Sequence, residues 1–491
     1  MAMMASREFD KDKNKDYSEW YNTILYAADL VDNRYNVQGF IVHKPNAAIP
    51  LRKVTEMIER ELEDKGHSPV MFPVVIPEEN FEKEKEHAQG FKLEVFWVTH
   101  AGNEKLARRL ALRPTSETAM YQMYSLWIQS KSQLPLKLYQ SCNVYRNESE
   151  TNPFLRGREF SWIEAHDVFD SKDHAARQIE EDMAITHKVL TDQLGLALLA
   201  IKRPQWDKFP GADDTYGADV ILPDGKALQI ATTHMLGQRF AKAFGVKFQD
   251  ENGKDQFAWQ TCYGPGTWRM MGALIGVHGD NKGLLWPMSI APTQVVIVPI
   301  MKTGAPENAK ILDTAKSLFA VLKRAGFRAA LDDSDKTPGY KYSKWELIGT
   351  PARVEIGAKE VKENNVTLAR RDTGTRLTIP QAQIVGALTK LSAEMLDSMK
   401  EKTQNDLSKR IEDADTKQEV LKILEKKGVA RAPFHSTDDD GAKCAEELQT
   451  FTKGGKVRGT RFGMNEKPSS NAKCVVCGKP AKQTVYIARQ Y

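Results

Sequence analysis

Cysteine is scarce in this sequence, and long apolar runs are missing. Five cysteines among 491 residues exclude a scaffold built on disulfides, as small secreted domains have. The longest apolar runs, residues 194–201 and 295–300, are far shorter than the roughly 20 residues that a membrane-spanning helix needs. Residues 1–16 are charged and polar and lack the apolar core of a signal peptide. We therefore expect a cytoplasmic protein with no membrane partner.

An excess of charge of one sign is also missing. Lys and Arg number 70 and Asp and Glu 65, so the formal net charge is +5, and 41% of the residues are hydrophobic. This composition excludes a collagen, a coiled-coil rod and a mostly disordered chain, and at about 150 residues per domain the length suggests about three domains. Residues 451–491 hold nine basic residues against one acid, Glu466. That imbalance indicates either a polyanionic partner or a solvated surface.

Common signatures of phosphate-binding loops and hydrolases do not occur either. The sequence has no Gly-x-x-x-x-Gly-Lys-Ser/Thr, which excludes a phosphate-binding loop of that kind. No Gly-x-Ser-x-Gly elbow and no acid pair typical of a glycosidase stands out. A nucleotide site in this chain would have to be built in another way.

The first half of the chain alternates predicted helices and strands without a strict βαβ repeat. Apolar spacing predicts helices near residues 51–62, 119–128, 173–194 and 268–278, the first of them ended by Gly66. Strands are predicted at 136–146 and 158–169, a short apolar strand at 70–76 is broken by Pro73 and Pro77, and further hairpins turn at 223–225 and 251–253. The strands at 136–146 and 158–169 form a hairpin with a long loop. This order predicts an α+β domain around a mainly antiparallel sheet.

The pattern changes after residues 287–292, where we place a domain boundary. A strand at 295–299, a helix at 309–324, strands at 327–331 and 353–356 and a hairpin at 366–379 predict a compact α/β domain. A polar helical stretch, 381–425, leads to a last small α/β domain that holds three of the five cysteines. The predicted domains are residues 1–290, 291–395 and 396–491.

The hairpin at 136–169 carries the most informative side chains. Alternation along a strand puts Arg146 and Glu148 on one face, and a set of four residues shares one face of the returning strand. This set is Phe160, Trp162, Glu164 and His166. Burying a carboxylate and an imidazole beside aromatic rings costs several kcal/mol unless they are paired. The pattern therefore favours a ligand-binding face over a plain core.

Arginines are placed near the same face. Arg156 and Arg158 lie at the end of the hairpin loop, and Arg269 follows Gly264 and Gly266 at the start of a predicted helix. Guanidinium groups hold phosphate oxygens and stack on bases, so this set suits a nucleotide. The alternative is a group of unrelated surface arginines.

These residues also carry a resemblance to class II aminoacyl-tRNA synthetases. Tyr-Arg-Asn-Glu at 145–148, followed by Arg156 and Phe160, resembles motif 2 of that family. Residues 65–73 resemble motif 1, and 264–273 resemble motif 3, although the usual Glu before Arg269 is missing. Thr-Ser-Glu at 115–117, Trp-Ile-Glu-Ala-His at 162–166 and Gln-Ile-Ala-Thr-Thr-His at 229–234 resemble the prolyl-tRNA synthetases of the archaeal and eukaryotic type. The resemblance extends from about residue 16 to the end.

The resemblance implies the roles of individual residues. The implied ATP-binding residues are Arg146, Glu148, Arg156, Phe160, Gln229, Thr267 and Arg269, of which Gln229 and Thr267 would lie near the ribose. The implied proline-binding residues are Thr115, Glu117, Arg146, Trp162, Glu164, His166 and His234. Arg146 and Arg269 would be the catalytic residues.

The resemblance further implies ligation of proline to tRNA(Pro) from ATP and Mg²⁺, by a homodimer formed through motif 1. Two alternatives are a synthetase of the same subclass for another amino acid and a catalytically silent, tRNA-binding relative. The threonyl relative has a zinc-binding cysteine where Val144 and Tyr145 stand here, which disfavours threonine. Only about a hundred residues separate Glu164 from Thr267, so we expect no editing domain between motifs 2 and 3.

The segment 293–391 resembles the anticodon-binding domain of the same subclass. The candidates for reading guanine edges are Glu346, Arg353 and Lys359. A carboxylate accepts from the guanine N1 and N2 donors, and a cation donates to O6 and N7. The alternative is an ordinary ion pair at a helix end.

The last domain contains a Cys-Val-Val-Cys-Gly sequence at 474–478. This spacing predicts a structural Zn²⁺ site with Cys474, Cys477 and, 30 positions upstream, Cys444. A thioredoxin-like pair is the alternative, but it needs a helix where a glycine turn follows. The fourth ligand is left open between His435 and one of three acids, Asp438, Asp439 and Asp440. The resemblance also implies that Tyr491, the last residue, reaches back toward the catalytic domain.

Overall fold

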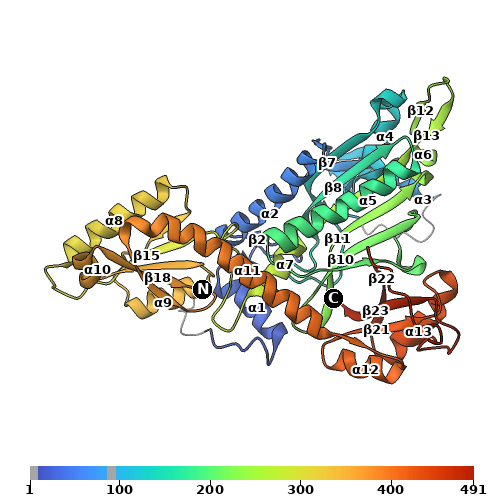
Figure 1. Cartoon of the computed structure of the whole chain (residues 1–491). Helices are drawn as coiled ribbons and strands as arrows, with labels where there is room; N and C mark the ends of the chain where they lie inside the picture. Colours follow the sequence, from blue (N-terminus) through green and yellow to red (C-terminus); the bar gives the residue numbers. More distant parts are fainter. Residues whose placement is uncertain (1–8, 86–94) are drawn as a thin grey trace.

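A computed structural model describes residues 9–85 and 95–491; residues 1–8, part of the predicted polar start, lie outside the described residues. Its largest sheet has eleven strands (Figure 1). In spatial order they are β20 (Ile411–Asp413), β21 (Val429–Phe434), β23 (Gln483–Gln490), β22 (Gly455–Arg461), β9 (Leu199–Lys202), β10 (Asp214–Ile221), β11 (Lys226–Gly237), β14 (Trp259–Pro265), β8 (Glu159–Phe169), β7 (Leu136–Tyr145) and β3 (Ser68–Pro69). The predicted antiparallel sheet of the first half is confirmed.

The informative hairpin is β7 and β8, which pair antiparallel from Leu136 opposite Val168 to Tyr145 opposite Glu159. The predicted turns at 223–225 and 251–253 are confirmed, since they join β10 to β11 and β12 (Lys247–Gln249) to β13 (Asp255–Phe257). Between β8 and β14 the chain forms β9, which pairs with β10, these two hairpins, a short 3₁₀ turn at Gln205–Asp207 and helices. These helices are α5 (Lys172–His187) and α6 (Arg239–Phe244), with a π-helical turn at Lys188–Gln193. This segment therefore contains no inserted domain.

Helices cover the first part of the sheet. They are α1 (Tyr17–Ala27), α2 (Pro45–Asp64), α4 (Glu117–Trp127) and α7 (Thr267–His278). The predicted break at Pro73 is confirmed: β3 ends at Pro69 before it and β4 (Val75–Pro77) begins after it, so only the last two residues of the apolar run at 70–76 lie in a strand. β4 belongs to a three-stranded sheet with β5 (Trp97–Ala101) and β6 (Glu104–Leu112), close to α3 (Glu78–Lys85).

The second part is the predicted α/β unit. Its five strands are ordered β16 (Ala329–Leu331), β15 (Val295–Pro299), β17 (Ala352–Ile356), β18 (Asn365–Arg370) and β19 (Arg376–Pro380). Its helices are α8 (Asn308–Arg324), α9 (Pro338–Leu347) and α10 (Ala358–Glu363). β15 is buried along its whole length, as its continuous apolar run predicts.

The C-terminal part has no sheet of its own. β22 pairs with β9, and the end of β23 pairs with the start of β11, so β20–β23 extend the sheet of the first part. The predicted polar stretch 381–425 is mostly α11 (Ile384–Arg410), which runs from the α/β unit to the C-terminal part (Figure 1). Because α11 crosses the predicted boundary at 395–396, the link between the two parts is a continuous helix. The remaining helices are α12 (Lys417–Glu425) and α13 (Ala442–Phe451).

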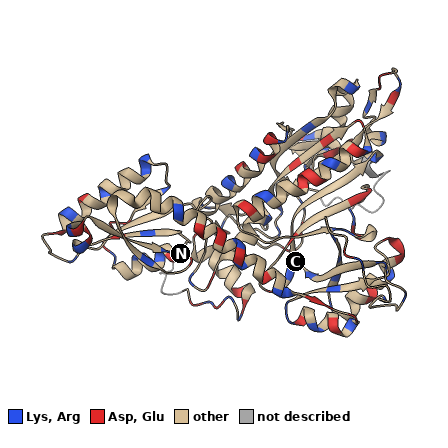
Figure 2. Cartoon of the chain, in the orientation of Figure 1, with Lys and Arg blue, Asp and Glu red and all other residues tan. Residues whose placement is uncertain are grey.

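The basic stretch 451–491 is not uniformly solvated. Figure 2 shows acidic and basic residues interspersed over the C-terminal part. One of its nine basic residues, Arg458, is fully buried and ion-paired with Asp219 of β10. None of the described helices is long and apolar enough to cross a membrane.

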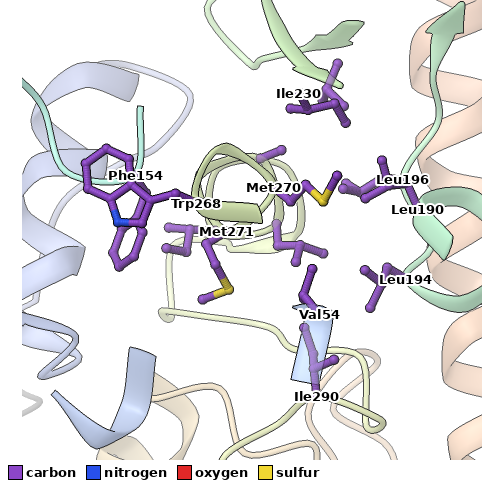
Figure 3. Packing of buried hydrophobic residues seen from close by; sticks show 14 of the residues in the cluster. Val54, Phe154, Leu190, Leu194, Leu196, Ile230, Trp268, Met270, Met271 and Ile290 are labelled. Carbon is purple, nitrogen blue, oxygen red and sulfur yellow. The ribbon is translucent and has the colours of Figure 1, made fainter. Parts of the chain in front are cut away.

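Helix α7 lies in the centre of the main core. Trp268, Met270 and Met271 are buried within one apolar cluster with residues of several elements, among them Phe154 and Ile230 (Figure 3). Gly272 lets a neighbouring loop approach α7 closely. An added Cβ at Gly272 would lie 2.7 Å from the carbonyl oxygen of Phe154, in the loop that carries Arg156. The start of α7 and this loop are therefore held together by tight packing.

We predict that Gly272→Ala lowers the free energy of unfolding by about 1–3 kcal/mol, because a backbone oxygen cannot yield easily to the new methyl group. Gly386→Ala is the matched control. It also lies in a helix, but nothing stands within 4 Å of the added Cβ, so alanine should stabilise by about 0.5–1 kcal/mol. Urea unfolding followed by circular dichroism measures both. Equal shifts for the two variants would contradict the packing argument.

Candidate active site

A cavity of about 310 Å³ opens over β8, β11 and β14. Nine of the residues predicted from the sequence line it: Thr115, Glu117, Arg146, Phe160, Trp162, Glu164, Gln229, His234 and Arg269. Antiparallel pairing of β8 with β14, and of β14 with β11, brings these distant segments together. The predicted ligand-binding face of the hairpin thus lies in a real cavity.

Two arginines point into this cavity from different elements. The Nε of Arg146 donates to the Pro114 carbonyl at 3.2 Å, and its guanidinium lies 5.4 Å and 5.1 Å from the ring centroids of Phe160 and Trp162. Arg269, in the first turn of α7, donates to the carbonyls of Leu155 and Gln229 at 3.1 Å and 3.2 Å. Backbone acceptors therefore fix both guanidinium groups in place.

Burial and the positive charges of Arg146 and Arg156 lower the pKa of Arg269 to about 10. The guanidinium groups of Arg146 and Arg156 therefore lie close enough to Arg269 to repel its charge. An anion placed among them would relieve this repulsion, and phosphate oxygens match guanidinium donors in geometry. The site is prepared for an anionic ligand.

Three predicted ATP-binding residues lie outside the cavity lining: Glu148, Arg156 and Thr267. Arg156 forms an ion pair with Glu148, with 3.5 Å between Nη1 and Oε2. The Nε of Arg158 donates to the Glu148 carbonyl at 2.8 Å, which ties the two ends of the hairpin loop. Glu148 and Arg156 thus hold each other beside the arginines of the cavity.

A carboxylate cluster forms another part of the cavity wall. Glu164 accepts from the Oγ1 of Thr115 at 2.8 Å, and from the backbone N and Oγ of Ser116 at 3.0 Å and 2.5 Å. The same Thr115 hydroxyl also contacts the carboxylate of Glu117. A hydroxyl has one hydrogen and can donate to only one of the two acids. A ligand with N–H donors would supply the second acid with a partner.

The two predicted histidines occupy different places. His234 lines the cavity, and its Nδ1 is hydrogen-bonded to the Thr215 hydroxyl at 2.9 Å. Its ring lies 4.7 Å from the Phe209 ring, between centroids. Burial lowers the pKa of His234 to about 3, so the ring is neutral. His166 is fully buried and does not line the cavity. It lies behind Glu164, 3.6 Å from that carboxylate, and the charge of His166 holds the pKa of Glu164 below its usual range despite burial.

The predicted ribose-side residues are also separated. Gln229 lines the cavity, and its Oε1 accepts from Arg203 at 2.7 Å. Thr267 instead donates to the Ser161 carbonyl at 3.1 Å and lines a separate cavity of about 530 Å³, with Cys142 and His43. The structure thus brings Gln229, but not Thr267, to the main cavity.

Sequence reasoning missed several residues of the cavity wall: Arg203, Asp207, Lys208, Phe209, Thr215 and Cys262. Five of them come from β10 and the segment before it, and no motif marks that segment. Cys262 is buried, and its sulfur lies 3.8 Å from Glu117. A signal existed for Ile230, Ala231 and Thr232, inside the quoted run at 229–234, and for Gly264 and Gly266, inside the quoted run at 264–273, and all five line the cavity.

The anticodon candidates are only partly brought together. Arg353 on β17 pairs with Glu346, in the last turn of α9, at 3.2 Å, and with Glu355 at 3.1 Å. Its guanidinium also lies 3.7 Å from the ring centroid of Tyr342. Lys359 is exposed at the start of α10, and among the described residues no contact joins it to this pair. The pair has the form of the ion pair at a helix end that we gave as the alternative.

Four side chains of the C-terminal part form a candidate metal centre. The ligand atoms of His435, Cys444, Cys474 and Cys477 all lie within 4.8 Å of one another. The Nε2 of His435 lies 3.2 Å from the Asp440 carbonyl, which orients Nδ1 toward the Cys477 sulfur at 3.7 Å. Burial and the neighbouring thiols raise the pKa of Cys444 to about 12. A bound cation would lower the pKa of Cys444 and favour its thiolate form.

The end of the chain returns to the first part of the fold. The backbone N of Tyr491 donates to the Ala227 carbonyl at 3.2 Å, and the Tyr491 ring packs against the main core. The nearby charges that act on its hydroxyl include Arg156 and Arg269. The implied return of Tyr491 to the catalytic part is thus present.

Comparisons with known proteins agree with this geometry. Family models match the class II tRNA synthetase core domain (G, H, P, S and T) over residues 91–278, an anticodon binding domain over 294–391 and the prolyl-tRNA synthetase C-terminal domain over 417–491. A proline–tRNA ligase of Thermofilum pendens is 50% identical over 489 residues, covering 99% of this chain and 100% of the relative. One of Pyrococcus horikoshii is 41% identical, covering 97% and 98%.

Solved structures lead to the same family. Prolyl-tRNA synthetase of Giardia lamblia in complex with prolyl-adenylate superposes with a TM-score of 0.94 at 32% identity, covering 98% of this chain and 100% of that one. The Cryptosporidium parvum enzyme complexed with halofuginone and AMPPNP gives 0.92 at 31% identity, covering 98% and 99%. The chain therefore belongs to the family of proline–tRNA ligases.

Proposed function

We propose that this protein ligates L-proline to tRNA(Pro) in two steps. ATP and proline first form prolyl-adenylate and pyrophosphate, and the prolyl group then passes to the 3′-terminal adenosine of the tRNA. One observation carries the proposal: Arg146 and Arg269 converge on the cavity that Phe160 and the acids Glu117 and Glu164 also line. Cations for phosphates, a ring for a purine and acids for an ammonium are thus present in one site.

The first step needs positioning more than a protein base. The carboxylate of proline is already ionised and attacks the α-phosphorus of ATP in line with the leaving pyrophosphate. Arg146 lies between the aromatic rings and the acids, so it suits both the substrate carboxylate and the α-phosphate. Arg269 and Arg156 suit the remaining phosphate oxygens, where charge develops as the bond to pyrophosphate breaks. Phe160 would stack on the adenine.

ATP enters as its Mg²⁺ complex, in which phosphate oxygens and water supply most ligands of the ion. Glu148 is the carboxylate held beside the arginines by the ion pair with Arg156. On this proposal Glu148 contacts the adenine amino edge. Gln229 and Thr267 were assigned to the ribose; the cavity lining supports Gln229, and the burial of Thr267 against Ser161 favours a supporting role.

Proline fits the carboxylate part of the cavity. Its ring nitrogen is a secondary ammonium with two N–H donors, and Glu117 with Thr115 offers acceptors for them. Trp162 and the neutral ring of His234 present apolar surface to the pyrrolidine ring. Glu164 and His166 form a buried pair that fixes Thr115 and so acts behind the substrate.

The other parts would handle the tRNA and the partner subunit. Glu346 and Arg353, with Lys359 nearby in sequence, are proposed to contact anticodon guanines, which requires their mutual ion pair to open. A homodimer would cover an exposed apolar set near motif 1, namely Met71, Val74, Leu126 and Trp127. Translation places such an enzyme in the cytoplasm.

We further propose that His435, Cys444, Cys474 and Cys477 bind a structural Zn²⁺. Three thiolates and one imidazole are a common tetrahedral zinc set, and the four donor atoms are already gathered. The acids Asp438, Asp439 and Asp440 are outside this group, so His435 is the favoured fourth ligand. The ion would stiffen the C-terminal part rather than take part in the reaction.

The function is tested by pyrophosphate exchange into ATP with each amino acid in turn. We expect exchange with proline. Exchange with another amino acid alone would favour a synthetase of different specificity, and no exchange with any amino acid would favour a silent, tRNA-binding relative.

The assigned role of Arg146 predicts a large effect of its removal. Arg146→Ala should lower proline-dependent exchange by about 100- to 1,000-fold, because charge developing on phosphate oxygens loses its partner. Arg108→Ala, which removes an exposed arginine paired with Glu79, is the control and should be unaffected. Retained activity in Arg146→Ala, with an unchanged circular dichroism spectrum, would overturn the site assignment.

The zinc proposal predicts about one zinc ion per chain in the purified full-length protein, by elemental analysis. The double variant Cys474→Ser, Cys477→Ser should lose the ion, because two of four donors become poor ligands. Cys142→Ser, far from the cluster, should keep it. A wild-type protein free of zinc after growth with added zinc would contradict the proposal.

A further inference from the structure

Three buried charged residues join the C-terminal part to the wall of the active-site cavity. Asp219 of β10 accepts from the Nη2 of Arg203 at 2.7 Å, and from the Nε and Nη2 of Arg458 at 2.9 Å and 3.1 Å. All three residues are at most 3% exposed. Arg203 comes from the segment after β9, whereas Arg458 is on β22, so the cluster spans the junction where the two sets of strands meet.

The cluster is ionised and carries an excess positive charge. Burial alone would raise the pKa of Asp219, but the two arginines lower it to about 2. Two cations therefore share one anion. An unpaired buried charge is strongly unfavourable, so removing or shortening one arginine disturbs the position of the other two groups.

The cluster extends to a residue of the cavity. The Nη2 of Arg203 also donates to Gln229 at 2.7 Å. Because arginine has donors only, the atom of Gln229 that faces it is the amide oxygen. The amide NH₂ of Gln229 is thereby turned away from Arg203 and is available to an acceptor in the cavity, which Gln229 lines.

The position of Arg203 is itself narrowly defined. Its guanidinium lies across β10 at Gly217, where an added Cβ would stand 2.7 Å from Nη2. Its Nη1 donates to the carbonyl of Arg458 at 3.3 Å. Arg203 thus donates to the Arg458 carbonyl, the Asp219 carboxylate and the Gln229 amide. Arg458 supplies the first acceptor itself and holds the second through its own bonds to Asp219.

We propose that Arg458 is a positioning residue for nucleotide binding: through Asp219 and Arg203 it fixes the amide of Gln229 so that its NH₂ group faces the ligand. The inference rests on the proposed function, in which Gln229 contacts the ribose of ATP. It makes the C-terminal part necessary for a complete nucleotide site, although that part supplies no group that touches ATP. Arg458 is not a catalytic residue.

The test is a double-mutant cycle in the full-length, zinc-loaded protein, read by proline-dependent pyrophosphate exchange. Arg458→Lys keeps the charge but cannot bond both oxygens of Asp219, so it should raise the KM for ATP about tenfold, with kcat and the KM for proline changed less than about twofold. In a Gln229→Met background, Arg458→Lys should raise the KM for ATP by less than about twofold, because the amide that Arg458 positions is gone. Arg461→Lys, on the same strand, is the control.

A KM for ATP that Arg458→Lys leaves unchanged would overturn the inference, and so would an equal effect in the Gln229→Met background, which would indicate general damage. If Arg458→Lys fails to fold, Gly217→Ala displaces Arg203 from its other side and must give the same selective, Gln229-dependent change. Wild-type activity separates the two proposals: no exchange with proline in the wild type defeats the proposed function, whereas normal wild-type exchange with additive variants defeats only this inference.

Discussion

The gathering of the positive charges of Arg146 and Arg156 around Arg269 is the constraint that the rest of the site depends on. Three like charges do not gather in the absence of an anion unless the fold holds them. Here the backbone carbonyls of Pro114, Leu155 and Gln229 hold two of the groups, and Glu148 holds the third. The free energy for this arrangement comes from the β7–β8 hairpin and from the dense packing around α7 (Figure 3).

Two buried acids line the same cavity and complement this positive region. Glu117 and Glu164 share the Thr115 hydroxyl, and Glu164 is paired with His166 behind it. A ligand that is an anion at one end and an ammonium at the other satisfies both regions at once. An amino acid that reacts with a nucleoside triphosphate has this distribution of charge, and the secondary ammonium of proline brings two donors to an acid that lacks one.

Much of this site was predictable because it depends on local pattern. Alternation along the strand placed Phe160, Trp162 and Glu164 on one face, and all three line the cavity. The same reasoning failed for His166, because alternation gives the face but not the depth at which a neighbouring element covers it. The contact of Arg203 with Arg458 could not be predicted from the sequence, because it depends on the pairing of β22 with β9, whose residues are more than 250 positions apart. The break at Pro73 in the apolar run at 70–76 was predictable, because proline acts locally.

One sheet extends through the catalytic and C-terminal parts, and it brings residues that are far apart in the sequence to the same site. In the proposed function, Arg146, Arg156, Arg269 and Phe160 form a preformed binding site for ATP. A crystal structure with a non-hydrolysable ATP analogue and proline tests this most directly. The account predicts phosphates among Arg146, Arg156 and Arg269, adenine against Phe160, and the proline nitrogen at Glu117. Phosphates bound elsewhere, with these arginines still facing an empty cavity, would contradict it.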